Sequence, residues 1–148
     1  MASRIVTSLL ALLAAACNGP FGLLPGGKLD GEIRPAPATW DRVGKSGQMQ
    51  LESRPGDPYS VNVNFTVIDG DLYVNAGDTR TEWVKHIEAD PRVRLRIDGV
   101  LYELQAVRVT DPAEIARFGE GWTQQSMFLR DPTQFEEVWI YRMVPRQV

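Results

Sequence analysis

Hydrophobic and polar residues alternate with a period of two over much of the chain, a pattern typical of β-strands that are buried on one face. Residues 48–53 form the first such segment, and the turn-forming run at residues 55–58 ends it. Residues 60–67 alternate strictly. Their apolar positions are Val61, Val63, Phe65 and Val67, and their polar positions are Ser60, Asn62, Asn64 and Thr66. The pattern therefore predicts two strands before residue 69.

Two Asp-Gly pairs predict tight hairpin turns. The turn at residues 69–70 gives four expected cross-strand pairs: Val67 with Leu72, Phe65 with Val74, Thr66 with Tyr73, and Asn64 with Asn75. The turn at residues 98–99 gives three: Leu95 with Tyr102, Val93 with Leu104, and Arg94 with Glu103. The first register keeps both faces of the hairpin consistent in polarity, which supports it.

Capping residues predict two short helices. Residues 79–82 fit a capping box with Thr79 as the N-cap, and the helix is expected to end at Asp90-Pro91. Its apolar side consists of Trp83, Val84 and Ile87. Asp111-Pro112 is expected to begin a second helix that ends at Gly119. In this helix Glu114 takes the capping position, and Ile115 and Phe118 form the buried side.

The last part of the chain completes the predicted architecture. Asp131-Pro132 is expected to start a further helical turn. Residues 138–144 are apolar on both faces except at Arg142, so this strand is expected to be central in the sheet. About six strands, two or three short helices and hairpin connections predict a mainly β (α+β) fold, an antiparallel barrel or roll.

The first seventeen residues have the layout of an export signal. Arg4 is their only charged residue, an apolar stretch follows, and small residues precede Cys17, the only cysteine of the chain. A single cysteine at that place resembles the lipobox of bacterial lipoproteins, so residues 1–16 are expected to be a signal peptide and Cys17 the lipidated residue. The alternatives are an uncleaved N-terminal anchor and a non-lipidated signal cut after Ala16. The lipidated form predicts a protein of the cell envelope, outside the cytoplasm and anchored to a membrane.

Residues 17–39 are expected to form a tether between lipid and domain, because prolines and glycines break regular structure there. The alternative is an extended arm that packs on the domain through Phe21, Leu23 and Leu24. The folded domain is expected to cover residues 40–148. A hydrophobic content of 43% is sufficient for a core, and a formal charge of −3 argues against a nucleic-acid partner.

The order of these elements resembles the split β-barrel of the pyridoxamine-phosphate oxidase superfamily, and its deazaflavin-dependent nitroreductase branch. The similarity is sharpest over residues 72–95, where a strand leads into a tryptophan-containing helix that stops at Asp90-Pro91. Members of the superfamily often bind FMN, a deazaflavin (coenzyme F420) or haem between two subunits. The resemblance therefore implies a homodimer, with FMN or F420 favoured over haem as the cofactor.

The resemblance also implies that a cofactor phosphate meets basic residues at the start of the first helix, where free amides and the helix dipole favour an anion. Arg80 and Thr81 occupy that position, and Lys85 lies one turn further. Glu82 stands close by, and a carboxylate there competes with a phosphate for the same amides. Other cofactor-contacting candidates are the three asparagines of one face, Asn62, Asn64 and Asn75, and the tryptophans Trp83, Trp122 and Trp139.

The remaining candidate residues favour a structural interpretation. Arg92, Arg94 and Arg96 form a basic stripe, of which Arg94 is expected to pair with Glu103. His86 is the only histidine, so a histidine-rich metal site is excluded. Catalysis by protein side chains is not expected, and any chemistry would come from a cofactor. Two hypotheses follow: a non-catalytic module that binds a small ligand or a partner, and a flavin- or deazaflavin-dependent oxidoreductase.

Overall fold

A computed structural model describes residues 18–77, 81–125 and 138–147 of the chain. Its strands are β1 (Glu32–Ile33), β2 (Ser46–Ser53), β3 (Tyr59–Ile68), β4 (Asp71–Ala76), β5 (Arg92–Ile97), β6 (Val100–Arg108) and β7 (Trp139–Pro145). Its helices are the 3-10 turn η1 (Asp41–Val43) and the α-helices α2 (Glu82–Ala89) and α3 (Pro112–Gln125). The expected helical turn at Asp131-Pro132, the expected N-cap Thr79 and the expected lipidation site Cys17 lie outside the described residues.

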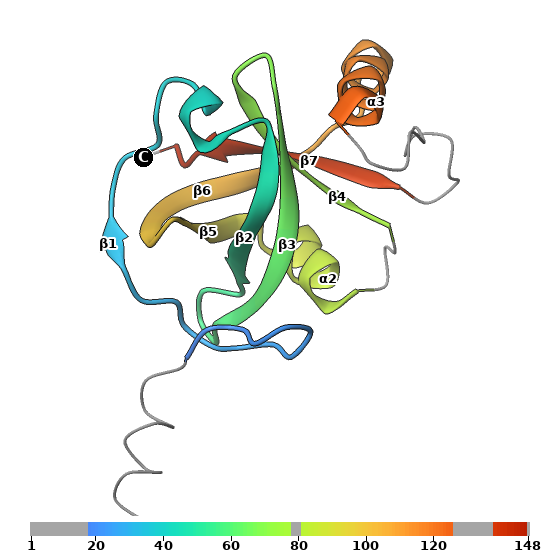
Figure 1. Cartoon of the computed structure of the whole chain (residues 1–148). Helices are drawn as coiled ribbons and strands as arrows, with labels where there is room; N and C mark the ends of the chain where they lie inside the picture. The colour runs from blue at the N-terminus through green and yellow to red at the C-terminus, as the bar shows by residue number, and fades with distance from the viewer. Residues whose placement is uncertain (1–17, 78–80, 126–137, 148) are drawn as a thin grey trace, which may run out of the picture.

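Six of the strands close into an antiparallel barrel (Figure 1). The order around it is β6-β5-β2-β3-β4-β7, and β7 pairs with β6 to close the circle. The short strand β1 is added outside the barrel, parallel to β6. β7 lies between β4 and β6, so the predicted central position of the last strand is confirmed. The mainly β, antiparallel barrel with short helices is the predicted fold class.

Both predicted hairpins form, with one difference. The second hairpin has all three expected pairs. In the first, the ladder between β3 and β4 contains Val67–Leu72 and Thr66–Tyr73 but ends there, so the expected pairs Phe65–Val74 and Asn64–Asn75 do not form. Beyond Tyr73, β4 stays paired with β7 as far as Ala76, while β3 continues along β2. The two strands therefore diverge beyond Thr66, as Figure 1 shows.

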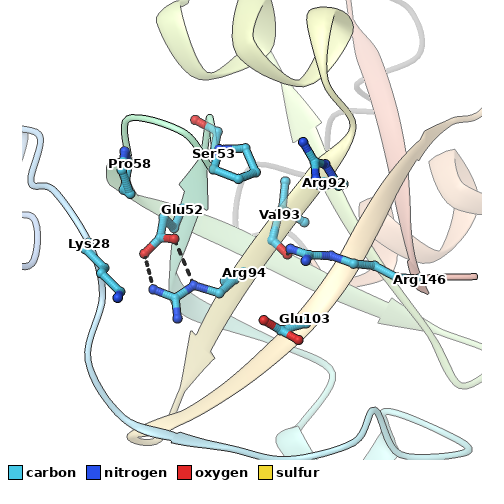
Figure 2. A pocket seen from close by; sticks show the side chains of 10 residues that line it. Lys28, Glu52, Ser53, Pro58, Arg92, Val93, Arg94, Glu103 and Arg146 are labelled. Carbon is cyan, nitrogen blue, oxygen red and sulfur yellow. Dashed lines mark hydrogen bonds and ion pairs between the residues drawn. The ribbon is translucent and has the colours of Figure 1, made fainter. Parts of the chain in front are cut away.

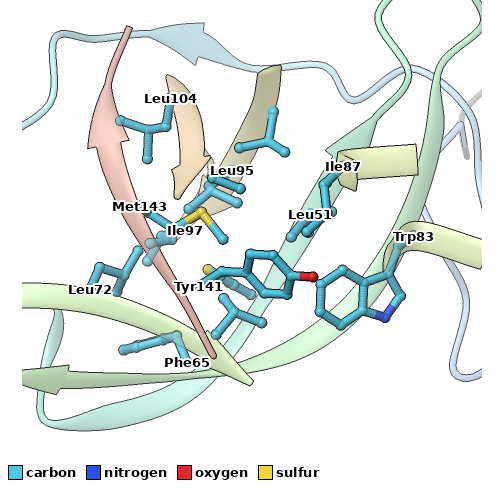
Figure 3. Close-up of a cluster of buried hydrophobic side chains, with 14 of the residues drawn as sticks. Leu51, Phe65, Leu72, Trp83, Ile87, Leu95, Ile97, Leu104, Tyr141 and Met143 are labelled. Carbon is cyan, nitrogen blue, oxygen red and sulfur yellow. The ribbon is translucent and has the colours of Figure 1, made fainter. Parts of the chain in front are cut away.

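The barrel interior holds the main core, and α2 covers one of its openings. Leu51, Leu72, Leu95 and Leu104 are fully buried at its centre. The expected apolar side of α2, formed by Trp83, Val84 and Ile87, packs against this cluster (Figure 3). The helix begins at Glu82 with Thr81 as its N-cap residue, which is later than the start expected from a capping box. Glu82 instead binds Lys85, one turn further along the helix.

The helix α3 covers a second, smaller cluster outside the barrel, in which Phe118 is buried among Ile68, Tyr73, Val109 and Ile140. The prediction that Gly119 ends this helix was wrong, because α3 continues to Gln125. Gly121, two residues later, lies at a close approach of the helix to β3. A Cβ atom at Gly121 would lie 2.7 Å from the Cδ1 atom of Ile68, so its absence lets α3 approach β3 closely.

The expected capping role of Glu114 was also wrong. Its carboxylate accepts hydrogen bonds from the Tyr73 hydroxyl at 2.9 Å and from the Arg142 guanidinium at 2.5 Å. Asp111 caps the start of the helix, because its side chain accepts a hydrogen bond from the amide of Ala113 at 3.3 Å. Glu114 therefore fastens α3 to strands β4 and β7.

Residues 18–39 run along the barrel as an extended arm (Figure 1). Leu29 is 1% exposed, and its amide donates to the buried carboxylate of Glu52 at 2.5 Å while its carbonyl accepts from Arg94 at 2.8 Å. Further along, the guanidinium of Arg96 donates to the carbonyl of Asp30. The alternative expected from the sequence is an arm that packs on the domain through Phe21, Leu23 and Leu24, but these three side chains are exposed. The arm is thus held by hydrogen bonds to its backbone and by the buried side chain of Leu29, and not by the three side chains predicted for this role.

Candidate functional site

The divergence of β3 and β4 opens a cavity of about 280 Å³ beside the start of α2. Its polar lining comprises the amides of Asn64 on β3 and Asn75 on β4, together with Thr81 at the start of α2. The indoles of Trp83 on α2 and Trp122 on α3 also line it, and the remaining walls are Val63, Ala76 and Gly77. Five predicted candidates are therefore brought together: Asn64, Asn75, Thr81, Trp83 and Trp122. Asn64 and Asn75 are nevertheless not a cross-strand pair. We call this space the amide cavity.

The amide cavity is uncharged along its described lining. Asparagine side chains present both donors and acceptors, so the pair can match the edge of a ligand that carries carbonyl and N–H groups. Indole rings offer flat apolar surface against which a ring can pack. The volume lies near the lower end of ordinary ligand sites, which begin at about 300 Å³. The cavity therefore suits a small, flat and uncharged group.

The other predicted cofactor-binding residues lie elsewhere. Asn62 lines a different groove, and its side-chain amide donates to the carbonyl of Gly22 at 3.0 Å. Lys85 does not line the amide cavity, and its ammonium group binds Glu82 at 2.7 Å. Arg80 lies outside the described residues. Trp139 contacts the guanidinium of Arg108, which lies 3.4 Å from its ring centroid.

Trp83 lines the amide cavity and also packs in the main core. It is 9% exposed, and its ring meets that of Tyr141 edge-on with centroids 6.1 Å apart, as Figure 3 shows. The Tyr141 hydroxyl donates to Glu88 at 2.7 Å, and burial together with this bond raises the pKa of Tyr141 far above its ordinary value. Trp83 is therefore held in place by a neutral, hydrogen-bonded neighbour.

A second cavity, of about 400 Å³, lies between the arm and β5 (Figure 2). Its lining includes four basic residues, Lys28, Arg92, Arg94 and Arg146. Its Arg94 binds Glu52 at 2.7 Å, not the expected Glu103, although Arg94 and Glu103 are opposite each other on β5 and β6. The reason is that Glu52 is also opposite Arg94, on the other neighbouring strand β2, and is 5% exposed. A buried carboxylate makes the stronger partner because less water screens it.

The rest of the basic stripe is also engaged within the chain. Arg92 binds Asp90 at 2.6 Å and lowers the pKa of that carboxyl to about 2. Arg96 donates to the side chain of Gln50 at 2.6 Å. Each arginine of the stripe thus has an internal partner, which agrees with the structural interpretation. Arg146, which the sequence did not single out, donates to two backbone carbonyls of the same region, those of Leu104 and Val93.

His86 stands apart from the amide cavity. Its Nδ1 atom is 3.0 Å from the Ser53 hydroxyl, and its ring meets Tyr59 edge-on at 4.9 Å. Burial lowers the pKa of His86 below its ordinary value, and the nearby Arg54 guanidinium acts in the same direction. The only histidine of the chain is therefore placed as a neutral packing residue. It does not line the amide cavity and so does not offer a haem iron an axial nitrogen there.

No group of three or more histidine, cysteine, aspartate or glutamate side chains that could hold a metal ion occurs within the described residues. In the same part of the chain, none of the helices is both long and apolar enough to cross a membrane.

Comparison with known proteins shows the fold. No protein-family model and no curated protein matches the sequence. Among solved structures, an FAD-binding protein from Mesorhizobium loti matches at 16% identity and a TM-score of 0.51, over 68% of this chain and 79% of that one. A putative pyridoxamine 5'-phosphate oxidase from Listeria innocua matches at 20% identity and a TM-score of 0.50, over 68% and 84%.

A third solved structure is HutZ, a haem storage protein from Vibrio cholerae. It matches at 16% identity and a TM-score of 0.51, over 68% of this chain and 82% of that one. These neighbours are split-barrel proteins like pyridoxamine-phosphate oxidase, and this chain has the same closed barrel of six strands. The fold resemblance noted from residues 72–95 is confirmed in that respect.

Proposed function

We propose that this chain is a binding module on a split barrel, that it performs no catalysis with its own side chains, and that its ligand is a small, flat, uncharged ring. The observation that carries the proposal is the amide cavity, with two amides, one hydroxyl and two indoles at the place where β3 and β4 diverge. In this proposal Asn64 and Asn75 bind the polar edge of the ring. Trp83 and Trp122 pack on its apolar surface and exclude water.

The described lining fits the ring of a flavin or deazaflavin better than its phosphate. A ring edge with carbonyl and N–H groups finds partners in Asn64 and Asn75. A phosphate is bound most strongly by basic side chains, and the part of the lining that the structure describes contains no charged residue. The nearest lysine of α2 is engaged with Glu82. A bound flavin would supply redox chemistry, and the residues of this chain would orient its ring.

The alternative function is a flavin- or deazaflavin-dependent oxidoreductase acting on a small molecule. The observation that favours it is the fold, which the chain shares with an FAD-binding protein and a putative pyridoxamine 5'-phosphate oxidase. Those similarities lie at 16% and 20% identity, where they establish the fold alone. We therefore place the binding module before the oxidoreductase, on the basis of the side chains that line the amide cavity.

The proposed location is the cell envelope, with a lipid on Cys17 after removal of residues 1–16. This proposal rests on the sequence of that segment: one basic residue, an apolar stretch and small residues before a lone cysteine. A homodimer is part of the proposal through the resemblance to split-barrel proteins. Mass spectrometry of the protein from membranes would test the lipid, because a diacylglycerol on Cys17 adds a defined mass to a chain that lacks residues 1–16.

Removing the amide of Asn64 or Asn75 is expected to weaken ligand binding about fivefold each, since one hydrogen bond between neutral groups contributes about 1 kcal/mol. Lumichrome, the alloxazine that remains when a flavin loses its ribityl chain and phosphate, is a suitable flat probe with carbonyl and N–H groups, and fluorescence polarisation measures its affinity. Asn62→Ala is the matched control, because Asn62 belongs to the same strand but lines a different groove. Equal losses in Asn62→Ala and Asn64→Ala would contradict the assignment.

A further inference from the structure

Three of the four large hydrophobic side chains that are exposed in the described residues lie in one turn of the arm. Phe21, Leu23 and Leu24 are 81%, 103% and 67% exposed, whereas the fourth, Ile33, is 55% exposed on β1. Residues 20–27 contain no charged residue. We call residues 21–24 the apolar tip. A concentration of exposed apolar side chains on a folded surface marks a contact with a membrane or a protein.

Most of the backbone groups of the apolar tip are hydrogen-bonded within the protein. The amide of Phe21 donates to the carbonyl of Leu24 at 3.0 Å, and the amide of Leu24 donates back at 2.9 Å. Gly22 has a φ of 57°, which glycine adopts without strain, and its carbonyl accepts the bond from Asn62. A bilayer offers no water to backbone groups, so a segment that enters it must have them paired within the protein. The apolar tip meets this requirement at five of its eight backbone groups.

The base of the tip is fixed to the barrel. Gly26 exchanges two backbone hydrogen bonds with Ser60 of β3, both 2.9 Å long, and the amide of Gly27 donates to the carbonyl of Asn18 at 2.7 Å. A Cβ atom at Gly26 would lie 2.4 Å from the backbone of Gly19, so the two ends of the loop cross in close contact. The turn therefore has a fixed conformation, and this conformation keeps the side chains of Phe21, Leu23 and Leu24 exposed.

We propose that the apolar tip inserts into the boundary between headgroups and hydrocarbon of a lipid bilayer. The chain next to the tip favours this occupant over a second protein. Phe21 follows Cys17, the proposed site of the lipid, by four residues. Four residues span at most about 14 Å, so a membrane reached by the N-terminal segment is within reach of the tip. The inference goes beyond ligand binding in the amide cavity. Its choice of a membrane as the occupant rests on the proposed lipid on Cys17, but insertion of the tip can be measured without that lipid.

A position-specific fluorescent label tests this proposal on the full chain. Cys17→Ser removes the only native thiol, and Leu23→Cys or Ile33→Cys then provides one site for an environment-sensitive dye such as NBD. Each labelled protein is mixed with phosphatidylcholine vesicles, with and without nitroxide-labelled lipid. The Leu23→Cys label is expected to shift to shorter wavelength and to be quenched by the nitroxide. The Ile33→Cys label, also on an exposed apolar site of the arm, is expected to do neither.

Adding Phe21→Ser and Leu24→Ser to the Leu23→Cys protein is expected to reduce the quenched fraction, because burial of each large apolar side chain changes a partition constant by about tenfold. An unchanged Leu23→Cys label in the presence of vesicles would overturn the proposal. Equal responses at both label sites would also overturn it, since they would indicate general adhesion. A shift at Leu23→Cys that needs no vesicles and grows with protein concentration would assign the tip to a second copy of the chain instead.

Discussion

Replacing Glu52 with alanine is expected to lower the free energy of unfolding by about 3–5 kcal/mol, the usual effect of removing one partner of a buried ion pair. Glu52 and Arg94 are 6% and 13% exposed at their side chains, so the arginine would stay buried without a counter-charge. The amide of Leu29 would lose its acceptor at the same time, because it binds the same carboxylate. Urea denaturation of the wild-type and variant chains measures the difference.

Two further variants separate the charge of Glu52 from its other roles. Glu52→Gln keeps an acceptor for Leu29 but removes the charge, so its loss of stability is expected to lie between wild type and Glu52→Ala. Glu32→Ala removes an ion pair with Arg34 whose side chains are 67% and 54% exposed, and it is expected to leave the unfolding midpoint unchanged. If Glu52→Ala were as stable as Glu32→Ala, the buried pair would not hold the arm.

Replacing Trp83 with alanine is expected to cost about 3–5 kcal/mol of stability, as truncation of a buried tryptophan generally does. The indole packs against Tyr141 and the main core and also lines the amide cavity, so the same change should abolish lumichrome binding. Thermal and urea unfolding give the stability, and fluorescence polarisation gives the affinity.

Trp122→Ala is the matched variant for this prediction. Trp122 lines the same cavity but is only partly buried and packs against the smaller cluster under α3. Its removal is expected to weaken lumichrome binding with a smaller loss of stability than Trp83→Ala. Trp83→Phe should recover much of the stability by refilling the core. Full stability of Trp83→Ala would show that this indole is a ligand contact and not part of the core.

The parts of the fold that depend on local pairing could be predicted from the sequence. Alternation of polarity and the two Asp-Gly turns were sufficient for the registers next to each turn, such as Val67 with Leu72. The contacts between strands distant in sequence could not be predicted in this way. The pairing of β2 with β5, which brings Glu52 opposite Arg94, depends on barrel closure and not on any neighbouring residue.

The candidate site was predicted in its composition but not in its geometry. Asn64, Asn75, Thr81 and Trp83 line one cavity, and alternation had placed both asparagines on one face. The sequence did not indicate that β4 leaves β3 after Tyr73, because β7, the partner that draws it away, follows some sixty residues later. For the same reason nothing in the sequence marked Val63, Ala76 and Gly77 as walls of the cavity.

We propose that the amide cavity binds a flat ring through its described lining, which holds no basic side chain for a phosphate. Titration of the purified chain with lumichrome and with FMN, followed by fluorescence polarisation, tests it most directly. We expect lumichrome to bind saturably, and we expect the affinity for FMN to be no higher than the affinity for lumichrome. An FMN affinity ten or more times higher, about 1.4 kcal/mol or more, and lost in Arg80→Ala, would contradict it. That result would make the phosphate the main contact and favour the flavin-dependent oxidoreductase.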